Sequence, residues 1–416
     1  MWQLQVYGGL NEPDYVKGLV AVRKTKPTLE ELIHHHQVIG DFEDALASYE
    51  SMGNDLTIEL TSGLIRCYLE MNRPQTASML VKGLMTRDPE HREDLLKYQI
   101  ESAWNLGRWE EIEEAPSSSH DWSTNLGKTL FKCYKTQSIH QHVATMRQDL
   151  MIPISAAAME QGAYRRCYEY IVRLQILNEI DAWYSTLPED LPKLFKEWKT
   201  RQTFSQYSAS NLEAVLKVRR ALIEISLTKA RKSSSEMMSK LLSTELGDCW
   251  LSSAKVARKA GQLNKAYNLL LEAEKCNNPE VFLERAKLAW RRGSPENAIL
   301  ALENGIKDQY PEMAQLNKDG RLPTYLSKED LNICGQGKLL LARYVDDSAS
   351  LNHILVSGRF HEAKMLLKQN EDAYYFNACF FDKTIGKSYQ ASELDNHGDI
   401  IGNVQLWFTL HDSFVH

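Results

Sequence analysis

Apolar residues recur along this chain with the period of an α-helix, and the pattern is clearest on either side of Gly261. Before this glycine the apolar or small residues fall at positions i, i+4, i+7 and i+11, namely Trp250, Ala254, Ala257 and Gly261. After it they fall at i, i+3, i+4 and i+7, namely Leu263, Ala266, Tyr267 and Leu270. Both spacings are helical, so we predict two helices that meet at a corner. Ala266 should face the first helix and Lys265 should face solvent.

The same corner pattern recurs along the chain. It consists of a glycine or asparagine, a bulky residue or proline two positions later, and a small or apolar residue five positions after the first. Seven positions fit it: Gly40, Asn72, Gly107, Gly162, Gly261, Gly293 and Gly358. Glycine and asparagine tolerate the left-handed conformation that ends a helix. Several spacings are 32 to 35 residues, close to the roughly 34-residue tetratricopeptide period. We therefore predict an all-α solenoid of antiparallel helical hairpins.

Composition excludes several classes of protein. The chain has 416 residues, 43% hydrophobic and 25% charged, with a net charge of −6, which does not favour a direct nucleic-acid binder. Its seven cysteines are scattered and form no CxxC pair, which favours a reducing compartment without disulfides or a zinc ribbon. The sequence contains no apolar run long enough to span a membrane, and its start does not resemble a signal peptide.

Two short motifs invite interpretation as phosphate-binding loops. They are Gly127-Lys128-Thr129 and Gly386-Lys387-Ser388. The loop requires a glycine five residues before the second one, and those positions hold Trp122 and Phe381. The GxSxG, HExxH, HRD and DFG motifs are missing as well. An NTPase is thus the weakest hypothesis, and we expect no catalytic and no cofactor-binding residues.

Two groups of neighbouring histidines are candidate metal ligands, and both are rejected. His34, His35 and His36 are adjacent, and neighbouring residues on a helix point about 100° apart, so their imidazoles cannot converge on one ion. His140 and His142 have the same weakness. We therefore predict no metal site.

Two groups of basic residues are interpreted as solvated helix faces. The first contains Lys217, Arg219 and Arg220, and continues with Lys229, Arg231 and Lys232 into a mobile serine-rich loop. An anionic-ligand or phosphorylation site is the alternative. The second group, expected on the outer faces of stacked helices, contains Arg258, Lys259, Arg285, Lys287, Arg291 and Arg292.

Longer stretches carry a family resemblance. They are NEPDYVKGLVAVRKTKP (11–27), IPISAAAMEQGAYRRCYEYIVRLQIL (152–177), RRALIEIS (219–226), GDCWLSSAKVARKAGQLNKAYNLLLEAE (247–274) and ERAKLAWRRG (284–293). Together they resemble the FAT region of phosphatidylinositol 3-kinase-related kinases, and within that group the ATR-type DNA-damage checkpoint kinases. The resemblance runs from about residue 5 to about residue 400. It divides the chain into repeats at 1–115, 116–310 and 311–402, followed by a divergent tail at 403–416.

The resemblance implies more than the residues alone. Members of the family are large serine/threonine kinases whose FAT solenoid supports the kinase domain, joins dimer contacts and, in the ATR type, works in the nucleus with an interacting partner protein. HEAT repeats precede it and the kinase domain follows it. This chain begins inside the FAT region and departs from the family near residue 402, in the apolar tail NVQLWFTLHDSFVH.

We therefore expect a fragment, a mis-spliced gene model or a truncated paralogue, without kinase activity of its own. The tail should be poorly ordered or self-associating. The alternative is a free-standing tetratricopeptide-like protein that binds peptide partners.

Overall fold

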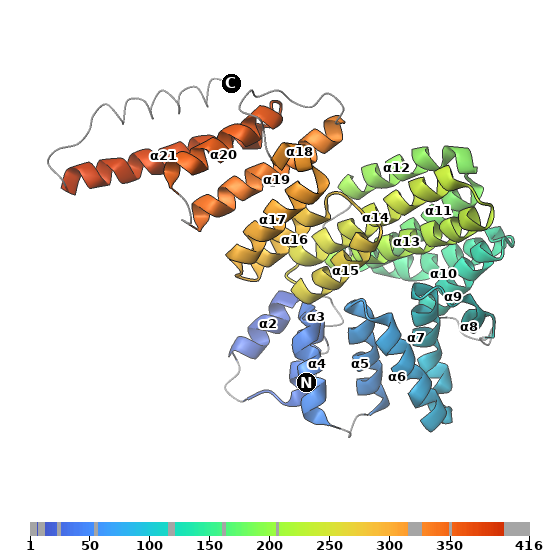
Figure 1. Ribbon diagram of the computed structural model, residues 1–416. Coiled ribbons are helices and arrows are strands. Elements are labelled where there is room, and N and C mark those ends of the chain that lie inside the picture. The colour runs from blue at the N-terminus through green and yellow to red at the C-terminus, as the bar shows by residue number, and fades with distance from the viewer. Residues whose placement is uncertain are drawn as a thin grey trace. The chain divides into compact units, whose positions relative to one another are not determined.

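The structure is a computed structural model, and it describes residues 6, 13–22, 26–53, 57–114, 121–159, 164–204, 208–314, 327–348 and 352–394. Helices joined by short turns make up this part of the chain, with no strand within these ranges (Figure 1). The all-α class is therefore confirmed. Gly162 and the tail 403–416 lie outside the described residues, and the predictions made for them are not tested.

The chain divides into two compact units, residues 1–277 and 278–416, and the four-part division expected from the sequence stays a prediction. The helices of the first unit are α2 (Pro13–Val22), α3 (Leu29–Ile39), α4 (Phe42–Met52), α5 (Ile58–Glu70), α6 (Pro74–Arg87), η1 (Pro89–His91), α7 (Arg92–Asn105), α8 (Trp109–Glu113), α9 (Trp122–Tyr134), α10 (His140–Ala158), α11 (Tyr164–Ser185), η2 (Pro188–Asp190), α12 (Leu191–Phe204), α13 (Ala209–Lys232), α14 (Glu236–Lys259) and α15 (Leu263–Lys275). The helices of the second unit are α16 (Val281–Arg291), α17 (Pro295–Gln309), α18 (Pro311–Ala314), α19 (Lys328–Asp347), α20 (His353–Leu366) and α21 (Glu371–Leu394).

Consecutive helices pack against each other in both units, as a solenoid of hairpins requires. Contacts join α3 to α4, α6 to α7 and α14 to α15 in the first unit, and α16 to α17 and α19 to α20 in the second. The small residues that follow the corners at Gly40, Asn72, Gly261 and Gly293 are each at most 1% exposed: Ala45, Ala77, Ala266 and Ala298. A small side chain lets two helix backbones approach closely.

Most of the predicted corners are confirmed by the backbone. Positive φ angles, from 56° to 89°, occur at Gly40, Asn72, Gly107, Gly261 and Gly293. At Gly40 the amide donates to the carbonyl of His36, which completes the last turn of α3. Most L-residues are strained in this conformation, whereas glycine is not and asparagine tolerates it.

The corner predicted at Gly358 is wrong. This glycine lies inside α20, whose first turn is capped by the side chain of Asn352, which accepts a hydrogen bond from the amide of Ile354. Phe360 and Ala363 then lie three residues apart on the buried face of the same helix. A helix interior can therefore reproduce the spacing of glycine, bulky and small residues without any turn.

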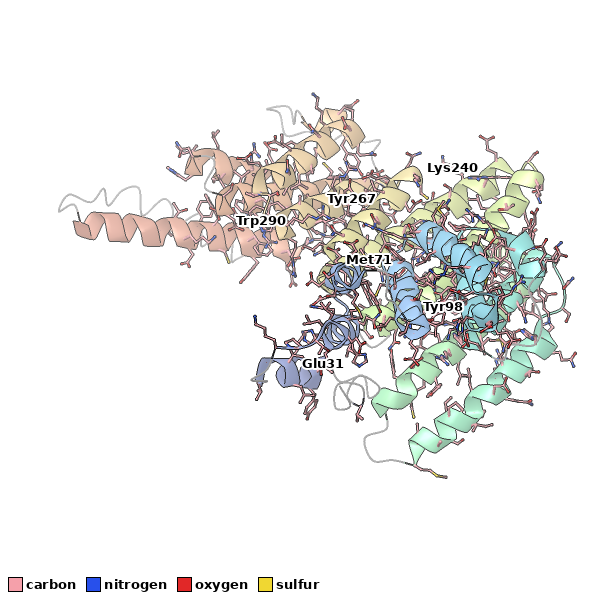
Figure 2. All side chains as sticks on the ribbon, turned by 90° about the horizontal axis from the view of Figure 1, so that it is seen from below. Glu31, Met71, Tyr98, Lys240, Tyr267 and Trp290 are labelled. Atoms are coloured by element: carbon pink, nitrogen blue, oxygen red, sulfur yellow. The ribbon has the colours of Figure 1, made fainter. Side chains whose placement is uncertain are left out.

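The last helix of the first unit contacts its earliest corners. From the start of α15, Gln262 donates to the carbonyl of Gly40 at 3.3 Å, and Asn268 donates to the carbonyl of Met71 at 3.4 Å. Met71 and Tyr267, labelled in Figure 2, mark the two sides of the second contact. Helix C-termini leave carbonyl groups without intrahelical partners, and these two amides satisfy one at each corner.

Lys265 belongs to the same contact, so its expected exposure is wrong. It is 5% exposed, and its Nζ lies 3.5 Å from a carboxylate oxygen of Glu70. The pattern misled because the polar edge of α15 faces α5 of the same unit rather than solvent. The neighbouring Ala266 is buried, as predicted.

Candidate functional site

Helix α13 is buried on all sides. Every residue from Val215 to Ile223 is at most 8% exposed, and α7, α9, α11 and α14 all pack against this helix. A helix buried all round is normally apolar all round, yet this stretch contains Lys217, Arg219 and Arg220. The solvated basic face expected from the sequence is therefore wrong for these three residues.

Arg219 forms a buried ion pair with Glu179 of α11. Its Nε donates to Oε2 at 2.8 Å and its Nη2 donates to Oε1 at 2.7 Å. The two side chains are only 3% and 2% exposed. The guanidinium also lies 5.2 Å from the centre of the Trp198 ring in α12. Two parallel charge-assisted hydrogen bonds fix direction as well as distance, so this pair holds α11 and α13 in one register.

Arg220 makes a second arrangement of the same kind. Its Nη2 donates to Oε1 of Glu213 at 2.7 Å, on the same helix, and its Nη1 donates to the hydroxyl of Ser253 in α14. The ring centre of Trp250, also in α14, lies 4.1 Å from the guanidinium carbon. Each buried arginine of α13 thus contacts one carboxylate and one indole, a combination that compensates the cost of desolvating the charge.

Lys217 lies among three carboxylates. Its Nζ is 3.9 Å from Oε1 of Glu101 in α7, and Glu70 and Glu213 also act on it electrostatically. Burial by itself would lower the pKa of Lys217, but these three carboxylates raise it above its ordinary value. For Glu70 the signs are reversed, because burial raises the pKa of a carboxyl group. The nearby cations Lys217, Lys265 and Arg66 outweigh burial and lower the pKa of Glu70 to about 2. Opposite charges at this distance favour the ionised forms.

The sequence around the two arginines contains one signal of this network. Val218, Ala221 and Leu222 surround Arg219 and Arg220, so α13 has no polar side on which a solvated basic face could lie. Glu179 lies between the buried residues Leu177 and Ile180 of α11. Isolated charges inside apolar helices indicate buried pairs, although the identity of each pair depends on the tertiary fold.

The other basic residues are placed differently. Lys229 donates to the carbonyl of Cys133 at 3.0 Å, and Arg231 and Lys232 are exposed at the end of α13. Ser233 to Ser235 form a tight turn whose amides bond to carbonyls in the last turn of α13, not a long loop. The second basic group is exposed or half-buried throughout, as predicted: Arg258, Lys259, Arg285, Lys287, Arg291 and Arg292.

Neither candidate phosphate loop is a loop. Gly127, Lys128 and Thr129 lie within α9, where the Thr129 hydroxyl donates to the carbonyl of Asn125. A Cβ on Gly127 would overlap the side chain of Ile100, so this glycine serves close packing of α9 on α7. Gly386 likewise lies within a helix, α21.

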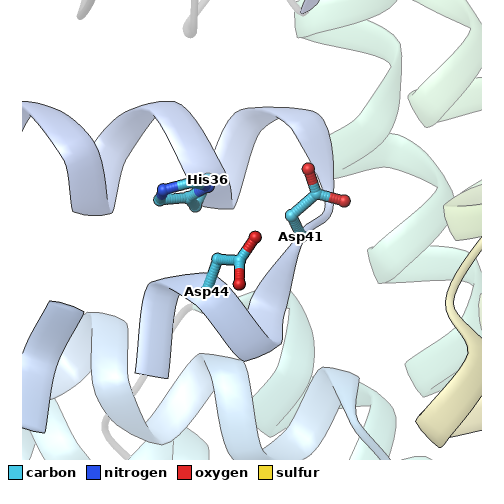
Figure 3. Close-up of side chains that lie close together, drawn as sticks. All are labelled: His36, Asp41 and Asp44. Atoms are coloured by element: carbon cyan, nitrogen blue, oxygen red, sulfur yellow. The ribbon is translucent and has the colours of Figure 1, made fainter. Parts of the chain in front are cut away.

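The histidines are not brought together, but one of them approaches two carboxylates. Ligand atoms of His36, Asp41 and Asp44 lie within 4.8 Å of one another where α3 meets α4 (Figure 3). Both aspartates are exposed, and exposed acidic groups commonly adopt such arrangements without a metal. His140 instead faces Asp181, with its Nδ1 3.2 Å from a carboxylate oxygen.

These features define a class of protein: an all-α helical-repeat protein whose helices are joined by buried ion pairs. The sequence matches the FAT domain over residues 96–404, and the chain belongs to this family. It is similar to the serine/threonine-protein kinase ATR of Arabidopsis thaliana, at 24% identity over 91% of this chain and 15% of that protein. It is also similar to the ATR kinase of Drosophila melanogaster, at 26% identity over 97% of this chain and 16% of the relative.

A solved structure described as the FAT and kinase domain of CtTel1 shares the fold. It aligns with 94% of this chain and 28% of its own length, with a TM-score of 0.63 and 14% identity. The chain spans only about 15% of the length of the curated relatives named above. Within the described residues, no helix combines the length and apolar character that crossing a bilayer would require.

Proposed function

We propose that the chain is a non-catalytic FAT scaffold segment of an ATR-type serine/threonine kinase that acts in DNA-damage checkpoint signalling and DNA repair. The observation that carries this proposal is the similarity to two ATR kinases over more than nine-tenths of the chain. The segment would support a kinase domain and HEAT repeats in the same polypeptide, and would contribute to contacts with an ATR-interacting partner protein or a second copy. Its place of action would be the nucleus.

The buried ion pairs of α13 support a scaffolding role. A scaffold must hold its hairpins at fixed relative positions, and apolar helix faces alone permit sliding by small shifts in packing. The bidentate pair between Arg219 and Glu179 is satisfied in only one register of α13 against α11. Rigidity of this kind is what a segment needs in order to position a catalytic domain that it does not itself contain.

The proposal is tested by identifying the native polypeptide. An antibody raised against this chain should detect, in nuclear extract, a polypeptide several times larger than 47.7 kDa. Mass spectrometry of the precipitated protein should recover kinase-domain peptides from the same band. A species of 47.7 kDa on its own, without kinase peptides, would refute the proposal and favour the free-standing tetratricopeptide-like protein.

A second measurement tests the absence of catalysis. The purified chain should show no ATP hydrolysis and no protein kinase activity above background, because its two GK[ST] matches lie on helices. Lys128→Ala and Lys387→Ala variants serve as controls for contaminating activity. Turnover that either substitution abolishes would contradict the non-catalytic assignment.

A further inference from the structure

A cavity of about 120 Å³ lies within the first unit, beside the charged face of α13. Its walls come from α5, α7, α9, α11 and α13, and the residues that matter here are Glu70, Glu101, Trp104, Trp122, Glu213 and Lys217. The volume is several times what one water molecule requires. A space of this size inside a helical unit is large enough to hold a small polar group.

Two buried polar atoms of the cavity walls have no hydrogen-bond partner among the residues that the structure describes. They are Oε2 of Glu213, an acceptor, and Nε1 of Trp104, a donor. Glu213 is 3% exposed and Trp104 is 4% exposed. An unpaired buried polar atom costs about 1–3 kcal/mol, so folded proteins usually supply such atoms with a partner. Oε2 of Glu213 therefore marks the cavity as a place for a ligand that donates a hydrogen bond, whereas Nε1 of Trp104, itself a donor, requires an acceptor.

The three carboxylates in the cavity wall are not equally compensated. Glu213 accepts a hydrogen bond from Arg220 at 2.7 Å and Glu70 lies 3.5 Å from Lys265, whereas Glu101 has only the ammonium group of Lys217. Lys217 reaches Glu101 only at 3.9 Å, beyond hydrogen-bond distance. Consistent with weak compensation, burial raises the pKa of Glu101, and the carboxylates of Glu70 and Asp121 add to this rise while Lys217 and Arg66 oppose it. A cationic donor bound beside Glu101 would supply the hydrogen bond that Lys217 does not make.

The ligand should be an organic cation rather than a metal ion. The cavity carboxylates are absent from the metal-type clusters found among the described residues, so their oxygens do not converge as a metal requires. Two indoles, Trp104 and Trp122, form part of the wall. Indole rings attract organic cations through their faces.

The network on α13 indicates which organic cation. Arg219 contacts the carboxylate of Glu179 and the ring of Trp198, and Arg220 contacts Glu213 and Trp250. The cavity offers the same combination of carboxylate and indole, but none of its described wall residues is an arginine. We propose that this cavity binds a guanidinium group, supplied by a small guanidinium compound or by an arginine side chain of a bound peptide.

The proposal is tested by calorimetric titration of the full chain. The probe is ethylguanidinium chloride, with the neutral isostere ethylurea as the ligand control. We expect one saturable site with a dissociation constant on the order of 1 mM, because a ligand of about six heavy atoms buries little surface. Equal binding of the two compounds, or no saturable binding of ethylguanidinium, would overturn the proposal.

A second pair of ligands distinguishes the sources of the group. N-acetyl-arginine methylamide carries the side chain in peptide form, and the citrulline analogue is its neutral control. Binding of the arginine compound at least as tight as that of ethylguanidinium supports an arginine of a peptide. Binding of ethylguanidinium alone supports a free small compound, because the backbone of the amino acid is then too bulky for the cavity entrance.

Variants locate the site. Glu101→Gln keeps the shape of the side chain and should weaken binding by about 10-fold or more, since it replaces a charge-assisted hydrogen bond by a neutral one. Glu93→Gln, at an exposed position of the same helix, should change nothing. Trp122→Leu, which removes one of the two indole rings of the wall, provides a second test if Glu101→Gln fails to fold. Unchanged affinity in a folded Glu101→Gln or Trp122→Leu variant would refute this location.

Discussion

Replacing Arg219 by methionine removes the guanidinium that neutralises Glu179 and leaves a carboxylate buried in the first unit. The variant loses both hydrogen bonds of 2.7 and 2.8 Å, while Gln175 still donates to Glu179 at 3.2 Å. Removing one partner of a buried pair costs about 3–5 kcal/mol. For a unit of this size, that corresponds to a fall in melting temperature of roughly 6–20 °C.

The assay is thermal unfolding followed by tryptophan fluorescence. Seven of the nine tryptophans belong to the first unit, because only Trp290 and Trp407 follow residue 277, so the signal reports mainly on the unit that contains the pair. The matched control is Arg87→Met, since Arg87 is exposed and its side chain is 71% accessible beside Asp88. The control should stay within about 0.5 kcal/mol of the wild type.

A double variant separates the charge from the packing. Arg219→Met combined with Glu179→Leu removes both charges, and its stability should return most of the way to that of the wild type, because no unpaired charge is left buried. The reasoning is refuted if Arg219→Met melts like the Arg87→Met control. It is also refuted if the double variant is less stable than both single variants, since packing rather than charge would then dominate.

Three further predictions concern stability in thermal melts. Burial raises the pKa of Glu224 to about 7, with Arg220 opposing this rise and Glu272 adding to it. The unfolded state therefore loses its proton at lower pH than the folded state, and the folded state loses stability as pH rises from about 4.5 to 7. Glu224→Gln should therefore stabilise by roughly 1–2 kcal/mol at pH 8, a value reduced for partial exposure, and by little at pH 4; equal effects would contradict the shift. Gly358→Ala should stabilise α20 by about 0.5–1 kcal/mol, because no atom lies within 4 Å of the added Cβ. Gly261→Ala should instead destabilise the chain, since the φ angle of Gly261 is +86°. Stability changes of the same sign for both substitutions would contradict the corner at Gly261. Lys265→Met should destabilise the chain by about 1–2 kcal/mol, because it removes the ion pair with Glu70 of α5. The control Lys240→Met, at an exposed position labelled in Figure 2, should have little effect. Similar melting temperatures for the two variants would show that the ion pair of Lys265 does not stabilise the fold.

Local chemistry was sufficient to predict the fold class and five of the seven corners. A helix end needs a residue that tolerates positive φ, and Gly40, Asn72 and Gly261 provide it within a few residues of the apolar stripes they separate. Gly358 fits the same spacing inside a helix, because Phe360 and Ala363 need only share a helix face. Spacing alone therefore does not distinguish a turn from a helix interior.

Burial of the charged residues could not be predicted in the same way. The partner of Arg219 lies 40 residues earlier in α11, and the ring beneath its guanidinium belongs to α12. Lys265 pairs with a glutamate nearly 200 residues away, in α5. Their exposure is decided by which helices are neighbours in the folded unit, and a helical repeat pattern does not specify neighbours that are distant in sequence.

The contact between α15 and the early corners also has a consequence during synthesis. Gln262 and Gly40 are 222 residues apart, so at about 5–20 residues per second a ribosome adds the helix that covers the first corner roughly 11–44 s after making that corner. Single helical hairpins form in far less time than this. On the nascent chain, the first hairpins must therefore persist for many seconds without the amide of Gln262 at the end of α3. Chaperone binding or aggregation of an incomplete chain would act during this interval, before α15 is available to close the first unit.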